Sequence, residues 1–264
     1  MSLNIVVCVK QVPVSNNLKI DPITKNMMRS SEPGIMNPFD QNAVEAALKL
    51  KERFDAKVTL LSMGPKNFEI TLRQGLAMGA DDAILLSSRG FGGADTLATG
   101  YVLSQAIKAI QNVNLVFFGR QSIDADTGQV GPIVAELLDW PQVTYISQIH
   151  PIDEKSIEAV RLMEHMQQSI KVKLPAVFTV RSELNVPRYP SPRSIMLSYQ
   201  KEIKVWDEHS FELDLNRIGI QGSPTVVRKV WNPTKVDKET ELLGEDPERA
   251  ARKLLHVLRA RDII

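Results

Sequence analysis

Four strand-like apolar runs alternate with four helix-like segments along the first half of the chain, and this order limits the possible folds more than any other feature. The apolar runs lie at residues 4–10, 57–63, 83–86 and 115–118. Apolar residues at helical spacing follow each run, at about residues 38–54, 68–78, 96–110 and 130–137. Strands that alternate with helices are joined by right-handed crossovers and form a parallel sheet. We therefore expect an α/β fold with a doubly wound, mostly parallel sheet.

The pattern changes after Gln142. Alternating apolar residues predict a fifth strand over 142–149, an antiparallel hairpin from residues 157–163 and 169–172, and a further strand over 176–181. Three prolines, Pro187, Pro190 and Pro192, then exclude a regular helix or a central strand. We expect a stiff, exposed loop there, followed by a helical turn at 195–199.

The last part of the chain has a different character. Ile203 and Val205 suggest an edge strand, and residues 219–233 suggest extended chain. Residues 245–261 predict an amphipathic helix with its apolar residues on one face, namely Ala251, Leu254, Leu255 and Leu258. We therefore predict an α/β nucleotide-binding domain over 1–200, and over 201–264 a C-terminal arm and helix that pack on a partner.

Composition excludes several classes of protein. The chain has 264 residues with 32 Lys and Arg against 31 Asp and Glu, so no overall charge attracts nucleic acid or an anionic membrane. One cysteine cannot form an internal disulfide, and the four histidines lack metal-ligand spacing, so we expect no metal. The sequence shows no signal peptide and no spanning helix of the usual kind, which predicts a cytoplasmic protein.

The carboxyl ends of the predicted strands locate a binding site. In an open parallel sheet, ligands bind outside these ends, where the strand order reverses. The loops that meet this condition begin at Cys8, Ser62, Gly90 and Gly119, and Asn37 lies on the same side. The expected cofactor-binding residues are Cys8, Val9, Asn37, Ser62, Met63, Asp95, Thr96, Thr99, Gly119, Arg120, Gln121, Asp124, Thr127, Gly128, Gln129, Val130 and Gly131.

Two predicted helix starts in this set suit phosphate groups. Asp95 is a good N-cap, as are Asp126 and Thr127, and the glycines 128 and 131 leave backbone N–H groups of the next turn uncovered. Both helix ends together could hold a diphosphate. The chain contains no complete phosphate-binding fingerprint, however, and an ordinary strand-to-helix turn with capping aspartates explains the same residues.

No residue pattern predicts bond-making chemistry. Cys8 lies inside an apolar strand, where cysteine usually acts as a small hydrophobe. Asp124 and Asp126 could be a paired acid and base, but a turn former and a cap are the more usual roles, and no histidine is near in sequence. We expect no catalytic residues, so any redox activity requires a bound cofactor.

Several segments resemble the β subunits of electron transfer flavoproteins, the family that includes FixA. They are "VVCVKQVP" (6–13), "NPFDQNAVEAALKLKE" (37–52), "SMGP" (62–65), "LAMGADDA" (76–83), "GRQSIDADTGQVGP" (119–132), "VKLPAVFTV" (172–180) and "NVPRYPSPRSIM" (185–196). The resemblance covers most of the first 200 residues in order and at the spacing of the family. It implies an adenine-nucleotide-binding, Rossmann-like domain that carries electrons between flavin dehydrogenases and a downstream acceptor.

The resemblance also implies partners and ligands. It implies a heterodimer with an α subunit that carries the redox FAD, around which the C-terminal arm wraps. The positions that hold AMP in simple members match Cys8, Asn37, Ser62 and the segment 119–131. The family's recognition loop for dehydrogenases corresponds to about 187–196, where we expect docking by Arg188, Tyr189, Ile195 and Met196. This chain has Pro192 and Arg193 where the family pattern has leucine and its neighbour.

Three functions stay open at this point. The segment "GADTLAT" (93–99) resembles the subgroup whose β subunit holds a second FAD and oxidises NADH by electron bifurcation. The alternative is a simple β subunit with structural AMP and no redox cofactor of its own. A nucleotide-sensing module of the universal-stress type would explain only the first 140 residues. The sequence does not identify the dehydrogenase, the acceptor or the redox potentials.

Overall fold

The computed structural model describes residues 3–14, 34–151, 153, 155–228 and 240–264. It divides into two compact units, Met1–Arg228 and Lys229–Ile264, and each is described by itself. Among the described residues, no helix is long and apolar enough to cross a membrane.

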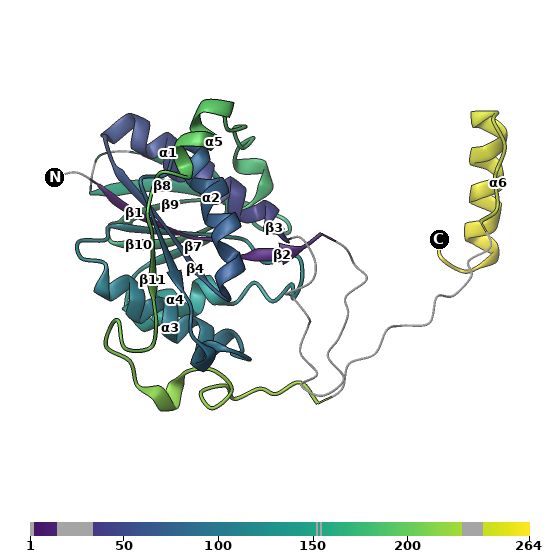
Figure 1. The fold of residues 1–264 in the computed structure, drawn as a ribbon. Helices are drawn as coiled ribbons and strands as arrows, with labels where there is room; N and C mark the ends of the chain where they lie inside the picture. Colours follow the sequence, from purple (N-terminus) through teal and green to yellow (C-terminus); the bar gives the residue numbers. More distant parts are fainter. Residues whose placement is uncertain (1–2, 15–33, 152, 154, 229–239) are drawn as a thin grey trace. The chain divides into compact units, whose positions relative to one another are not determined.

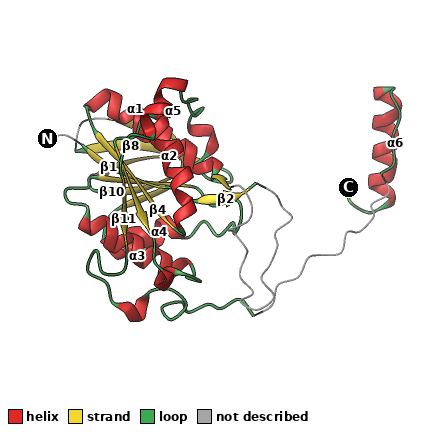
Figure 2. Ribbon diagram, in the orientation of Figure 1, coloured by secondary structure: helices red, strands yellow, loops and turns green. Residues whose placement is uncertain are grey.

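A nine-stranded sheet forms the centre of the first unit (Figures 1 and 2). Its strands, in spatial order, are β11 (Ile203–Trp206), β5 (Asp82–Leu86), β4 (Lys57–Met63), β1 (Asn4–Cys8), β6 (Leu115–Gly119), β10 (Ala176–Val180), β7 (Gln142–Pro151), β8 (Ser156–Leu162) and β9 (Gln167–Lys173). The pairings from β11 to β7 are parallel, whereas β8 and β9 form an antiparallel hairpin on β7. A separate antiparallel ribbon joins β2 (Gln11–Pro13) to β3 (Gly34–Met36). The expected α/β fold with a mostly parallel sheet is confirmed.

Helices cover both faces of the sheet (Figure 1). The helices of the first unit are α1 (Pro38–Phe54), α2 (Glu69–Met78), α3 (Thr96–Ala109), α4 (Val130–Leu138) and α5 (Pro192–Ser198), with short 3₁₀ turns η1 (Lys66–Phe68), η2 (Arg89–Phe91), η3 (Ser182–Leu184) and η4 (Leu215–Arg217). The second unit contains α6 (Pro247–Ala260). On β1, Ile5 and Val7 pack in the core cluster of α1 and α2, while Val6 and Cys8 pack in that of α3 and α4. This burial on both faces explains why the strand is a nearly continuous apolar run.

The predicted elements are largely confirmed, with a few displaced boundaries. The helix over 38–54 and the strand over 57–63 have the expected bounds, and the hairpin and the edge strand also form. The first strand ends at Cys8 instead of Lys10, because the Lys10 N–H donates to the Asp40 carboxylate. The expected turn at 195–199 is the longer helix α5, which starts at Pro192 because Ser191 caps it and proline fits the first helical position.

The C-terminal part of the chain contributes to both units. Strand β11 completes one edge of the sheet, and Trp206 packs on the core beside Phe211. Of the predicted extended stretch over 219–233, residues 219–222 instead form a turn, residues 223–228 have no regular structure, and residues 229–233 lie outside the described residues. In the second unit, α6 starts where the Asp246 side chain accepts hydrogen bonds from two backbone N–H groups, and Leu254 and Leu255 are exposed. The roles predicted for 1–200 and 201–264 stay predictions.

Candidate functional site

The strand order of the sheet reverses between β1 and β6. From β1 the chain continues through β4 and β5 on one side and then returns to β6 on the other side. Ligands of doubly wound sheets bind outside the carboxyl ends of the strands at such a switch point. The predicted loops after Cys8, Met63 and Gly119 therefore start at the carboxyl ends of β1, β4 and β6, where a ligand is expected.

The carboxylate of Asp40 joins the segments that meet at this switch point. Its Oδ2 accepts a hydrogen bond from the Lys10 N–H (2.8 Å), and its Oδ1 accepts from Asn37 Nδ2 (2.9 Å) and the Gly119 N–H (3.2 Å). A Cβ on residue 119 would overlap Asp40 Oδ1, so glycine is required for this close approach. The side chain of Asp40 thus connects the ends of β1 and β6 to the first turn of α1.

Asn37 and Lys10 hold the loop after β6 against this centre. Asn37 Nδ2 also donates to the Gln121 carbonyl (2.8 Å), and Asn37 Oδ1 accepts from the Ile123 N–H (3.2 Å). Lys10 Nζ forms an ion pair with Asp124 (2.7 Å) and donates to Ser122 Oγ (3.2 Å). Asn37 followed by Pro38 predicts a helix N-cap, but the Asn37 side chain caps no backbone N–H of α1 and instead orders the loop after β6.

Burial controls the ionisation of two side chains at the switch point. Desolvation raises the pKa of Asp40 to about 7, although hydrogen bonds from Asn37, Lys10 and Gly119 and the charge of Lys10 oppose the shift. Desolvation and the nearby Asp40 carboxylate raise the pKa of the Cys8 thiol well above its usual value. Cys8 is therefore a buried neutral thiol at neutral pH, which agrees with the expectation of no reactivity.

The N-termini of α3 and α4 lie beside each other. Thr96 Oγ1 donates to Gln129 Oε1 (3.0 Å), which joins the first turn of α3 to the residue before α4. The two helices approach so closely at Gly100 that a Cβ on this residue would overlap the Ile133 side chain. No side chain caps α4, so backbone N–H groups of its first turn suit an anionic group, whereas at the start of α3 the Leu97 and Ala98 N–H groups are bound by the Asp95 side chain.

Asp95 caps α3 as predicted and also binds a distant segment. Its Oδ1 accepts from the backbone N–H groups of Leu97 and Ala98 (3.0 Å each), and its Oδ2 accepts from Thr225 N (3.1 Å) and Oγ1 (2.8 Å). Ser223 Oγ accepts from the Asp95 N–H (2.9 Å). Burial favours the neutral form of Asp95, but the hydrogen bonds outweigh it and lower its pKa.

The loop between β6 and α4 differs from the prediction at its end. Asp126 and Thr127 were expected to cap α4, but the helix starts at Val130, and no side chain caps it. Asp126 has a left-handed backbone (φ 56°), and its carboxylate accepts a hydrogen bond from Gln121 Nε2. Gly131 is buried against Thr179 of β10, so its lack of a side chain serves helix-to-sheet packing.

Arg120 directly follows β6 and is the first residue of this loop. Its guanidinium is 6.0 Å from the ring centre of Phe39 and 5.7 Å from that of Tyr145, and its Nε donates to Gln121 Oε1 (2.8 Å). Contacts between guanidinium and aromatic rings at such distances are favourable. Arg120 is therefore held in a fixed orientation beside the predicted binding loop.

The buried hydroxyl of Ser62 shows whether the site suits a polar ligand. Its side chain, at the end of β4, is 1% exposed, and its Oγ has no hydrogen-bond partner among the described residues. Such a group is costly to bury, and native proteins rarely retain one without a purpose. The buried hydroxyl therefore fits a ligand with hydrogen-bonding groups at the end of β4.

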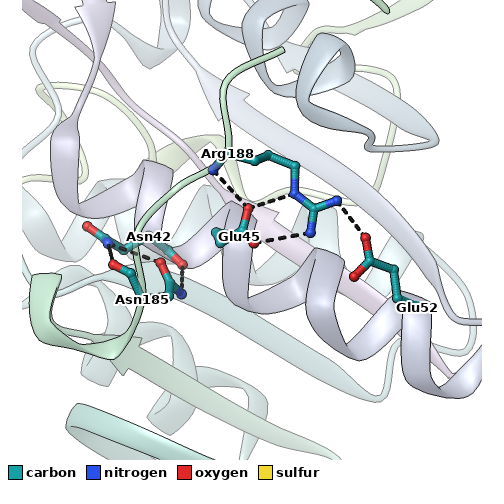
Figure 3. A network of polar contacts seen from close by, with 5 residues as sticks. All are labelled: Asn42, Glu45, Glu52, Asn185 and Arg188. Carbon is teal, nitrogen blue, oxygen red and sulfur yellow. Dashed lines mark hydrogen bonds and ion pairs between the residues drawn. The ribbon is translucent and has the colours of Figure 1, made fainter. Parts of the chain in front are cut away.

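The predicted docking residues form an exposed surface around α5. Tyr189 is 97% exposed, Met196 71% and Ile195 42%. Arg188 differs from them, because its side chain is bound to Glu45 and Glu52 of α1 (Figure 3).

Several residues of the site were not among the predicted ones. Sequence reasoning missed Asp40, Ser223 and Thr225, and it placed Lys10 and Ser122 in the predicted loops without naming them as binding residues. Asp40 could have been noticed as an acidic residue in the first turn of a predicted helix that starts at the site. Ser223 and Thr225 could not, because they belong to the predicted C-terminal arm and contact the site only through the tertiary fold.

Comparison with known proteins identifies the family of this chain. Residues 24–210 match the electron transfer flavoprotein domain. The chain is 44% identical over 263 residues to "Electron transfer flavoprotein subunit beta" of Thermoanaerobacterium thermosaccharolyticum, which covers 99% of this chain and 100% of the relative. It is 42% identical over 259 residues to "Protein FixA" of Azotobacter vinelandii (95% and 92% covered), and 43% identical over 263 residues to "Caffeyl-CoA reductase-Etf complex subunit CarD" of Acetobacterium woodii (99% and 100% covered). The chain therefore belongs to the electron transfer flavoprotein family, as a β subunit of the group that includes FixA.

Proposed function

We propose that this β subunit pairs with an α subunit, holds FAD at the switch point of its sheet, and carries electrons between flavin dehydrogenases and a downstream acceptor. The observation that carries the FAD assignment is the contact between Thr96 and Gln129, which joins the N-termini of α3 and α4. A diphosphate can accept hydrogen bonds from the Thr96 hydroxyl at the start of α3 and from backbone N–H groups at the start of α4, whereas the single phosphate of AMP needs only one of these groups.

The residues that would hold the nucleotide come from four loops. The helix ends at Thr96 and Gln129 would bind the phosphates, and the buried hydroxyl of Ser62 would hydrogen-bond the ligand at the end of β4. Asn37 and Asp40 would keep the loop after β6 in place without themselves performing chemistry. Bound FAD would supply the electron transfer, including NADH oxidation, because these side chains carry no redox group.

The nucleotide content of the purified heterodimer tests this proposal. Two flavins per heterodimer, together with bleaching of flavin absorbance by NADH, are the expected result. One flavin and one AMP per heterodimer would instead assign this chain to the simple carriers. Absorbance spectra and chromatography of the released nucleotides distinguish these outcomes.

We further propose that residues 189–197, called the docking segment, contact the flavin dehydrogenase. Its exposed apolar side chains, Tyr189, Ile195 and Met196, support a protein-binding surface. Prolines at 190 and 192 limit its conformational freedom, so docking would cost little ordering entropy. The name of CarD associates that relative with a reductase, which supports a partner of this kind. A cytoplasmic location and packing of α6 on the α subunit complete the proposal.

A further inference from the structure

A polar clasp ties the chain just before the docking segment to α1 (Figure 3). It consists of Asn42, Glu45 and Glu52 on α1 and of Asn185 and Arg188 on the chain that follows η3. Asn42 Nδ2 donates to the Asn185 carbonyl (2.8 Å), and Asn185 Nδ2 donates back to the Asn42 carbonyl (3.0 Å). Arg188 pairs with Glu45 (2.8 Å) and with Glu52 (2.5 Å).

Glu45 binds Arg188 through both of its carboxylate oxygens, which fixes the orientation of the arginine side chain. Its side chain is 4% exposed, and both of its carboxylate oxygens accept hydrogen bonds from Arg188, through the guanidinium and the backbone N–H. The two carboxylates raise the pKa of Arg188, and Arg188 in turn lowers that of Glu52. A forked arginine contact of this kind fixes direction as well as distance.

The other end of the docking segment is held by α2. Arg73 Nη1 donates to the carbonyls of Ser198 (2.6 Å) and Lys201 (2.5 Å), and its guanidinium lies 5.7 Å from the ring centre of Tyr199. Lys201 Nζ donates to the Ala80 carbonyl (2.7 Å). The docking segment is thus fixed at its start by contacts with α1 and at its end by contacts with α2.

We propose that Arg188 is a positioning residue, which fixes the docking segment through Glu45 and Glu52 and does not itself bind the dehydrogenase. All three guanidinium nitrogens of Arg188 donate to Glu45 or Glu52, and moving the guanidinium to a partner would leave the buried Glu45 carboxylate unpaired, which is strongly unfavourable. The inference rests on the proposed docking function. It assigns partner recognition to the exposed residues 189–197 and their geometry to the clasp.

The decisive variant is Glu45→Gln in the complete heterodimer, because it weakens the clasp and leaves no unpaired buried charge. Glu183→Gln is the matched control, since Glu183 pairs with Arg181 (2.6 Å), close to the clasp in sequence, but that pair lies within a single segment. The probe is an acyl-CoA dehydrogenase reduced by its substrate, chosen from a panel as the one that reduces the unaltered heterodimer fastest. The readouts are KM and kcat for flavin reduction, and hydrogen exchange of residues 189–197.

We expect Glu45→Gln to raise the KM for the heterodimer about tenfold with kcat unchanged, because the segment must be ordered at the moment of docking. Hydrogen exchange of residues 189–197 should become several-fold faster, while exchange of β4 stays as before. Adding Glu52→Gln should increase both effects, and Glu183→Gln should change neither.

Other results would overturn the inference. If Arg188 bound the dehydrogenase directly, Glu45→Gln would free it and leave KM unchanged or lower. A general stabilising role would lower the melting temperature and speed exchange throughout the chain without a specific rise in KM. A double variant, Ile195→Ser with Met196→Ser, separates this inference from the docking function. If it raises KM while Glu45→Gln does not, only the positioning role fails, and if it leaves KM unchanged, the docking proposal fails as well.

Discussion

Replacement of Ser62 by alanine should weaken nucleotide binding without weakening the nucleotide-free protein. The Ser62 hydroxyl is 1% exposed and has no hydrogen-bond partner among the described residues. Burying such a group costs about 1–3 kcal/mol, so its removal should leave the free energy of unfolding of the nucleotide-free heterodimer unchanged or about 1 kcal/mol higher. A nucleotide that hydrogen-bonds this hydroxyl would lose about 1–2 kcal/mol of binding free energy, which raises Kd roughly 5- to 30-fold.

Two measurements test this pair of opposite effects. Isothermal titration of the nucleotide-depleted heterodimer with AMP and with FAD gives the two dissociation constants. Urea unfolding with and without nucleotide gives the stability and the part that binding contributes. Ser104→Ala is the matched control, because Ser104 is also fully buried but its Oγ donates to the Tyr101 carbonyl (2.8 Å) on α3, inside the helix. Its loss should leave both affinities unchanged.

Two results would refute the reasoning about Ser62. Unchanged affinity for both nucleotides would mean that the hydroxyl does not contact the ligand. A loss of 1 kcal/mol or more in the nucleotide-free heterodimer would mean that Ser62 already has a hydrogen-bond partner there, such as ordered water.

Three further predictions concern the phosphate contacts, the docking segment and the buried carboxyl group of Asp40. Thr96→Ala with Thr127→Ala should raise the Kd for FAD by about one to several powers of ten, because each hydroxyl-to-phosphate bond contributes about 1.5–3 kcal/mol. Thr96→Ala alone should hardly change the Kd for AMP, and titration with both nucleotides checks both expectations. Ile195→Ser with Met196→Ser should slow electron transfer from a dehydrogenase while flavin content, read from the absorbance spectrum, stays the same. Asp40 should make the free energy of unfolding fall between pH 4 and 7, as measured by urea unfolding at several pH values.

The sequence predicted the elements best where local pattern and tertiary environment agree. The helix over 38–54 and the strand over 57–63 have the expected bounds, because an Asn-Pro start and a Gly-Pro end mark them clearly. The boundary at Cys8 was missed because the N–H of the next-but-one residue, Lys10, turns to Asp40, which lies 30 residues later. A local pattern contains no signal of such a competing acceptor.

The candidate site was predicted as a set of loops, and the contacts between those loops were not. Lys10 and Asp124 are 114 residues apart, and Asp95 and Thr225 are 130 residues apart. Each pair depends on the order of strands in the sheet, which follows from packing of the whole domain. The wrong cap at Asp126 has a local origin, because its side chain accepts a hydrogen bond from Gln121 in the same loop and α4 starts only at Val130.

The sign of the Asp40 prediction follows from proton binding in the two states. The pKa of Asp40 is about 7 in the folded chain, mainly because burial disfavours the charge, against an ordinary value of 3.8. Between these values the folded state keeps a proton that the unfolded state has lost, so stability falls as the pH rises and becomes constant above pH 7. At 1.36 kcal/mol per pKa unit the full effect is about 4 kcal/mol, and Asp40→Asn should abolish this slope. The carboxylates with lowered pKa, such as Glu183 at about 2, act with the opposite sign and only at acid pH, below their ordinary value of 4.5. A stability that rises from pH 5 to 7 in the unaltered heterodimer, with the same slope in Asp40→Asn, would show that Asp40 stays ionised and that its three N–H donors outweigh its burial.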